Sequence, residues 1–144
     1  MAAAAWRVYN GAKQHLLNGG IDLDATNVLK MYLFKSTSSA STPALSTLAQ
    51  LTTGFRVAGG GFKGAKFLTG SVKAGADASQ KKWSAGALVF TASGAAIGSV
   101  MYAVLAQSGG KLVAWSKLST AAFNVTTSNT LTVSMNALGI FTIR

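Results

Sequence analysis

The spacing of hydrophobic residues divides the chain into a short helical start and a longer β-type remainder. Over residues 2–17 the apolar positions recur at helical spacing, and no proline interrupts them. The apolar half of this helical wheel holds Ala5, Trp6, Val8, Tyr9, Ala12, Leu16 and Leu17. Asn18 and the two glycines after it are residue types that end helices. The pattern predicts one N-terminal α-helix within residues 1–18.

From residue 28 onward the period of the pattern is two, which is typical of strands. Residues 28–35 and 98–107 are long apolar runs, and residues 130–135 alternate apolar with hydroxyl side chains. Further strands are expected within 55–57, 62–72, 83–90, 111–117, 125–135 and 137–143, and one or two helical turns within 44–51. Gly109 and Gly110 form a tight hairpin turn. The chain is therefore mainly β, a sandwich or a barrel of about eight short strands.

The size and composition of the chain narrow its class. Its 144 residues are typical of a single domain, residues 1–144, and it has no cysteine for a disulfide or a thiolate metal site. Its apolar runs are shorter than the roughly 18 residues that span a bilayer, so we expect no membrane contact. The start of the chain lacks the basic-then-apolar pattern of a secretion signal.

Groups that handle protons are scarce. The chain has 13 Lys and Arg against 3 acidic residues, which gives a formal net charge of +10. The acidic residues are Asp22, Asp24 and Asp77, and His15 is the single histidine. A glycosidase needs two carboxylates across the scissile bond, and a nucleophile triad needs a histidine with an orienting partner. We therefore predict a protein that is not an enzyme, and a polysaccharide depolymerase is the least favoured class.

A glycine-rich segment resembles a cofactor motif but lacks its context. Residues 59–64 match the pattern G-x-G-x-x-G of dinucleotide-binding turns. That motif needs a helix after the glycines and an acidic residue about 20 positions later. Here residues 62–72 alternate like a strand, and Lys81 and Lys82 occupy the acidic position. We interpret the glycines as a turn or bulge and predict no cofactor.

Metal-ligating residues are equally sparse. Asp22 and Asp24 lie two positions apart, so on an extended segment they would share one face. A calcium site needs six to eight oxygens, so we interpret this pair as a turn whose side chains bond backbone amides. His15 lies on the polar side of the predicted helix, where a solvated or interface role is expected. No metal site is predicted.

Positive charge is concentrated in the middle of the chain. The candidate partner-contacting cations are Arg7, Arg56, Lys63, Lys66, Lys73, Lys81 and Lys82. A field of this sign attracts either nucleic acid or an acidic protein surface. The sequence shows no recognition helix and no paired aromatic motif of RNA-binding sheets, so we expect no specific nucleic-acid recognition. An acidic protein surface is favoured, and non-specific contact with packaged nucleic acid stays open.

Segments along nearly the whole chain resemble, in order, those of a family of small virion proteins from tailed bacteriophages. The similar segments are KQHLLNGGIDLD at 13–24, the strand at 28–34 with its Ser/Thr loop, TGFRVAGG at 53–60, Trp83 ahead of MYAVL at 101–105, the alternating strand at 130–135, and GIFTI at 139–143. In that family the corresponding pieces are a short helix, an "LLNG-IDLD" opening, a "GYTAGG" segment and a "GIFTL" ending.

This resemblance implies a jelly-roll-like β-sandwich over residues 28–144 and a structural role without catalysis. It implies a capsid decoration or cement protein on the exterior of the virion, bound to the major capsid protein and self-associating as a homo-oligomer. A tail or neck component, such as a connector or adaptor, is the first alternative, and a basic nucleic-acid-binding module is the second. Relatives are acidic ahead of the tryptophan, whereas Gln80, Lys81 and Lys82 stand here, which suits an acidic shell.

Overall fold

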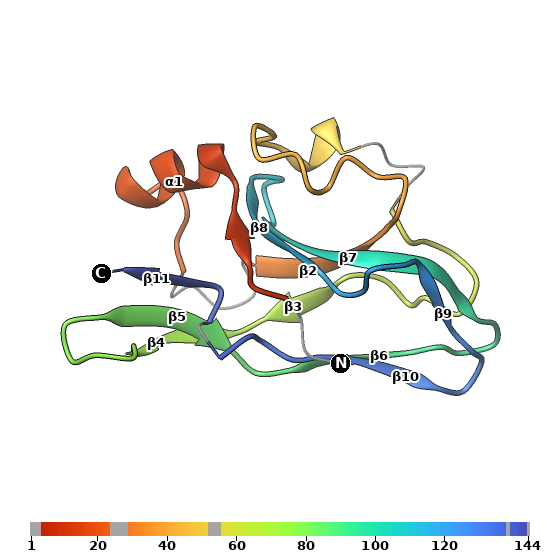
Figure 1. Cartoon of the computed structure of the whole chain (residues 1–144). Helices are drawn as coiled ribbons and strands as arrows, with labels where there is room; N and C mark the ends of the chain where they lie inside the picture. The colour runs from red at the N-terminus through yellow and green to blue at the C-terminus, as the bar shows by residue number, and fades with distance from the viewer. Residues whose placement is uncertain (1–3, 24–28, 52–55, 138, 144) are drawn as a thin grey trace.

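The computed structural model describes residues 4–23, 29–51, 56–137 and 139–143 (Figure 1). The protein is mainly β, with one α-helix near its N-terminus and several antiparallel sheets in a sandwich-like arrangement. The fold class predicted from the strand pattern is therefore confirmed.

The elements are short and group into three sheets. They are β1 (Arg7–Val8), α1 (Asn10–Leu17), β2 (Leu29–Lys35), the 3-10 helix η1 (Leu48–Gln50), β3 (Lys66–Leu68), β4 (Gly70–Ala74), β5 (Lys81–Ala85), β6 (Leu88–Thr91), β7 (Ile97–Gln107), β8 (Leu112–Lys117), β9 (Phe123–Val125), β10 (Thr130–Val133) and β11 (Phe141–Ile143). The central sheet has the order β1-β8-β7-β2-β3, with β9 also paired to β7. Two smaller sheets have the orders β10-β6 and β11-β5-β4.

Much of the hydrophobic core lies against one face of the central sheet. Directly opposite residues of antiparallel strands share a face, and Leu105 lies opposite both Met31 and Ala114. All three side chains are fully buried. They belong to the same hydrophobic cluster as Trp83 and Phe90 of the smaller sheets. Figure 1 shows β4, β5, β6 and β10 beneath the central sheet, with α1 and the loop around η1 above it.

The N-terminal helix is shorter than the sequence pattern predicts. It begins at Asn10, because Arg7–Val8 form β1 and pair with β8. The N–H of Tyr9 then donates to the carbonyl of Val113 (3.1 Å). Trp6 and Tyr9 flank β1 in this extended segment, and both side chains are buried. Their spacing fits a helical face, but the backbone here is extended. The helix prediction is wrong for residues 4–9, and residues 1–3 lie outside the described part.

Three predicted strands are divided in the structure, because their halves pair in different sheets. Residues 62–72 contain β3, which pairs with β2, and then β4, which pairs with β5. Residues 83–90 contain most of β5 and the start of β6, and residues 125–135 contain the end of β9 and all of β10. The strand expected at 55–57 is reduced to an isolated bridge between Arg56 and Phe34, and Phe55 lies outside the described residues. These divided strands are consequently shorter than expected.

The glycine run at 59–61 is a turn, as its sequence context predicts. Gly59 and Gly60 have φ angles of 70° and 54°, in the left-handed region that glycine tolerates. The carbonyl of Gly59 accepts the N–H of Phe62 (3.1 Å), which closes the turn. Gly61 accepts the N–H of Ser93 (3.1 Å), so the turn also fixes the chain between β6 and β7. The next element is the strand β3, so the turn lacks the helix that follows the glycines in a dinucleotide-binding motif.

Tyr9 fastens the N-terminal segment to the loop that follows β2. Its side chain is fully buried, and its hydroxyl donates a 2.5 Å hydrogen bond to the carbonyl of Ala40. We expect Tyr9→Phe to lower the free energy of unfolding by about 1–2 kcal/mol, because the buried carbonyl loses its donor. Urea denaturation at neutral pH measures the change.

The same variant tests a pH effect. Burial raises the pKa of the Tyr9 phenol in the folded protein, whereas the unfolded phenol ionises near pH 10. The contribution of Tyr9 to stability is therefore complete below about pH 10 and declines as the pH rises further. The stability difference between wild type and Tyr9→Phe should narrow above that pH. A difference that stays constant into the alkaline range would contradict the buried position of the hydroxyl.

Candidate functional site

The face of the central sheet opposite to that of Met31, Leu105 and Ala114 carries cations and aromatic rings. The pairing register sets them in three cross-strand rows: Arg7, Trp115, Val104 and Tyr32; then Lys117, Tyr102 and Phe34; then Phe67, Lys30 and Ala106. Paired residues share a face, so all three rows lie on one side of the sheet. We call this the basic–aromatic face, defined by Arg7, Lys30, Tyr32, Phe67, Tyr102, Trp115 and Lys117, with Arg56 beside Tyr32.

A loop covers the middle of this face. Residues 36–51 lie above the central sheet in Figure 1, and the hydrogen bond from Tyr9 to Ala40 anchors them there. Phe34 and Val104, in the middle of the rows, are buried. Two clefts stay open on the face, one over β1 and β8 and the other over β2.

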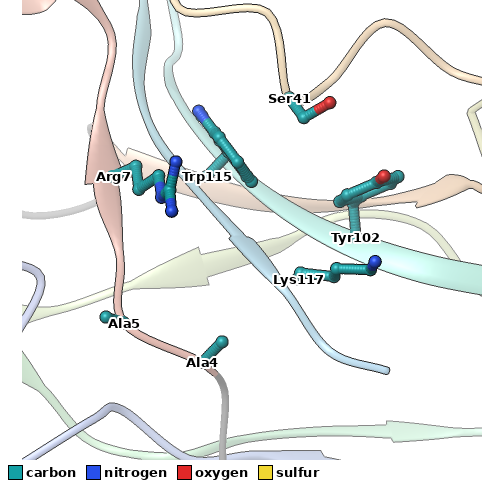
Figure 2. Close-up of a pocket in the computed structure, with 7 residues that line it drawn as sticks. All are labelled: Ala4, Ala5, Arg7, Ser41, Tyr102, Trp115 and Lys117. Carbon is teal, nitrogen blue, oxygen red and sulfur yellow. The ribbon is translucent and has the colours of Figure 1, made fainter. Parts of the chain in front are cut away.

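The first cleft combines two cations with a pair of aromatic rings (Figure 2). Its volume is about 390 Å³, and its lining residues are Ala4, Ala5, Arg7, Ser41, Tyr102, Trp115 and Lys117. The guanidinium carbon of Arg7 lies 5.5 Å from the centre of the Trp115 ring, which meets Tyr102 edge-on at 6.2 Å. Figure 2 shows Trp115 between Arg7 and Tyr102, with Lys117 on the Tyr102 side. No carboxylate is among the residues that line this cleft.

The second cleft repeats the combination over β2. Its volume is about 330 Å³, and its lining includes Lys30, Tyr32, Arg56 and Phe62. The guanidinium carbon of Arg56 lies 5.4 Å from the Tyr32 ring centre, and the Lys30 ammonium lies 4.4 Å from the ring centre of Phe67. Contacts of this kind contribute about 0.5–1 kcal/mol each at exposed sites. They hold the cations in place, and the lining again includes no carboxylate.

This geometry suits the binding of anionic groups. Both clefts present positive heads beside aromatic rings, which are buried in the first cleft and partly exposed in the second, so a carboxylate that enters meets a cation in a partly desolvated site. Within the described ranges, no group of three His, Asp or Glu residues could hold a metal ion. Asp77 accepts a 2.7 Å hydrogen bond from the Gln80 amide within the β4–β5 turn. Asp22 is exposed after α1, and Asp24, its predicted companion, lies outside the described residues.

The structure separates the seven cations that the sequence singled out. Arg7 and Arg56 each line one of the two clefts, and Lys63 is exposed in the loop before β3. Lys66 is on β3, its ammonium 5.9 Å from the Phe90 ring centre. The remaining three are Lys73, Lys81 and Lys82, on β4 and β5 of a different sheet. The charge-rich segment therefore does not form one contiguous patch.

Sequence reasoning missed two cations of the basic–aromatic face. Lys30 lies two positions before Tyr32, and Lys117 lies two positions after Trp115. At strand spacing each cation shares a face with its aromatic neighbour. That period-two pairing of a cation with an aromatic residue is the signal that could have revealed both. The half-buried His15 lies outside this face, near the end of α1, where its carbonyl accepts the N–H of Gly20 (2.7 Å).

The chain matches no protein-family model, no curated protein and no solved structure. Among the residues that the structure describes, no helix is long and apolar enough to cross a membrane.

Proposed function

We propose that the protein is a non-enzymatic structural protein of a phage virion, a decoration or cement protein of the capsid exterior. It binds the major capsid protein and stabilises the shell lattice. The observation that carries this proposal is the basic–aromatic face, whose clefts hold four cations and are lined by no carboxylate. Such a face is complementary to an acidic protein surface. The resemblance to small virion proteins supplies the class of partner.

The way in which this face presents its charges favours adhesion. A cation that already rests on an aromatic ring loses less conformational entropy when it meets a carboxylate. Arginine and aromatic residues are also the types enriched in protein interfaces. Many copies on a shell, associated with one another, add modest individual contacts into a large total. No cofactor or catalytic residue is part of this proposal.

The abundance of the protein in particles tests the proposal. A stained gel of intact virions should show a band whose intensity approaches that of the main shell protein. A tail or neck component would give only a faint band, because few copies fit such a ring. Absence from purified virions would contradict a structural role of either kind.

Salt should release the protein from capsids. Between about 0.1 M and 1 M salt the screening length falls from about 10 Å to about 3 Å, which weakens contacts between exposed charges. We expect the bound fraction in a capsid sedimentation assay to fall steeply over that range. Release that does not depend on salt would contradict the electrostatic basis of the proposal.

The same face makes a basic nucleic-acid-binding module the second candidate. Single-strand binding sheets present exposed rings on which bases stack. Here Trp115 and Tyr102 are 7% and 8% exposed, and Arg7 and Arg56 lie over ring faces. Little surface of these two rings is left for stacking, and Phe67, the most exposed ring of the face (45%), has the Lys30 ammonium 4.4 Å from its centre, which favours the protein partner. Tight, steeply salt-dependent binding of DNA by the isolated protein would instead favour the nucleic-acid-binding module over the capsid protein.

A further inference from the structure

An apolar groove lies between α1 and β11, away from the basic–aromatic face. Its volume is about 450 Å³, and its lining residues are Val8, Lys13, Leu16, Leu17, Leu23, Phe141, Thr142 and Ile143. Leu17 on the helix is 91% exposed, and Ile143 on the strand is 68% exposed. Figure 1 shows α1 above β11 at one end of the molecule. Large apolar side chains exposed on both walls of one groove are typical of a contact surface.

The three-stranded sheet adds one more exposed apolar residue on the same side. Phe141 lies opposite Trp83, and Trp83 lies opposite Val72, so the three side chains share one face. Phe141 lines the groove, which shows that this face is the one turned toward α1. Val72 is 60% exposed. The exposed apolar residues on this side are therefore Leu17, Ile143 and Val72, whereas Trp83 between β11 and β4 is buried.

Positive charges flank this surface. Lys13 lines the groove, and the exposed Lys81 lies directly opposite Ile143 and so on the same face. The lining residues include no carboxylate, and Asp22, next to Leu23, is the nearest acid along the described part of the chain. An occupant that covers the apolar walls and also carries carboxylates is complementary to both features.

We propose that the α1–β11 groove docks an extended segment of a partner protein that carries both apolar and acidic residues. Its apolar side chains cover Leu17 and Ile143, and its carboxylates pair with Lys13 and Lys81. In the described part of the chain β11 is an outer strand of its sheet, so an extended segment can continue that sheet. A second copy of this chain fits less well, because it would bring like charges together. The proposal does not depend on the partner being a capsid protein.

Short synthetic peptides provide the probe. Three fluorescent peptides of about six residues, the usual strand length, combine Leu with Asp, Leu with Lys, or Ser with Asp, with both residue types on each face of the extended peptide. We expect the Leu–Asp peptide to bind the full chain saturably in fluorescence anisotropy, and the other two to bind about tenfold more weakly. The Ser–Asp peptide measures attraction by charge alone, including any binding to the basic–aromatic face. Its equal binding, or no saturable binding of the Leu–Asp peptide, would overturn the proposal.

Substitutions then locate the binding. Leu17→Ser with Ile143→Ser should weaken the Leu–Asp peptide about tenfold, and Lys13→Gln with Lys81→Gln should weaken it a few-fold. Val89→Ser is the matched control, because Val89 is an exposed apolar residue (42%) on β6, outside the groove. Circular dichroism verifies that these surface variants are folded. Unchanged binding in the Leu17/Ile143 variant, or a wild-type dimer that this variant dissociates, would contradict docking of a partner segment.

Discussion

Neutralising the four cations of the basic–aromatic face is expected to weaken binding to capsids about a hundredfold. The variant carries glutamine at Arg7, Lys30, Arg56 and Lys117. An exposed ion pair contributes up to about 1 kcal/mol, so four pairs lost together amount to about 3 kcal/mol, and each 1.4 kcal/mol is a tenfold change. Cosedimentation with capsids stripped of the protein measures the loss.

A second variant, whose net charge is lowered by the same amount, distinguishes the effect of the basic–aromatic face from attraction by overall charge. It carries glutamine at Lys63, Lys66, Lys73 and Lys82, which also come from the charge-rich part of the sequence but line neither cleft. We expect only a few-fold loss of capsid binding, because the overall field falls equally while the clefts stay intact. Lys81 is left unchanged, since it flanks the α1–β11 groove. Equal losses in the two variants would show that the basic–aromatic face has no special role.

The long central strands could be predicted because their signal is local. Residues 28–35 and 98–107 are long, largely apolar runs, and β2 and β7 occupy them almost to the residue. Such runs are typical of strands that are covered on both faces. The turn at Gly110 is equally local, since its φ of 91° is a conformation that glycine tolerates best. The mainly β class followed from these elements.

The start of the chain could not be predicted in the same way. Trp6 and Tyr9 fit an apolar helical face, yet they also fit a short strand that ends before a helix. What decides between the two is β8, whose Ala114 and Trp115 pair with Val8 and Arg7. That partner is far away in the sequence, and no local window of residues contains it. Tertiary pairing thus overrides the helical pattern over residues 4–9.

The candidate site depends even more on long-range strand pairing, which a local stretch of sequence does not show. The sequence drew attention to Lys73, Lys81 and Lys82 because they are close along the chain, but closeness in sequence is a poor guide to a sheet face. The basic–aromatic face exists only because the register of four strands sets Arg7 beside Trp115 and Tyr32 in the same row. Register is determined by long-range pairing and bulges, such as the shift between Leu105 and Ala106, which the sequence does not specify.

Trp83→Ala is expected to have the largest effect on stability. Trp83 is 2% exposed, stacks on Phe141 at 6.1 Å, and covers Gly70, where even a methyl group would clash with the indole. Removing the ring should lower the free energy of unfolding by about 3–5 kcal/mol, because it leaves a cavity in the core. That loss is a large part of the about 5–15 kcal/mol of a typical domain. Urea denaturation monitored by far-UV circular dichroism measures it.

Val72→Ala is the matched control for this substitution. Val72 lies directly opposite Trp83 in β4 but is 60% exposed, so its truncation should change the free energy of unfolding by about 0.5 kcal/mol or less. Because both residues lie in paired strands, the difference between the two losses of unfolding free energy measures the effect of burial. A loss below about 1 kcal/mol for Trp83→Ala would contradict the packing of Trp83 against β11. Since Phe141 of β11 is one wall of the α1–β11 groove, that result would also remove the structural basis of the docking site.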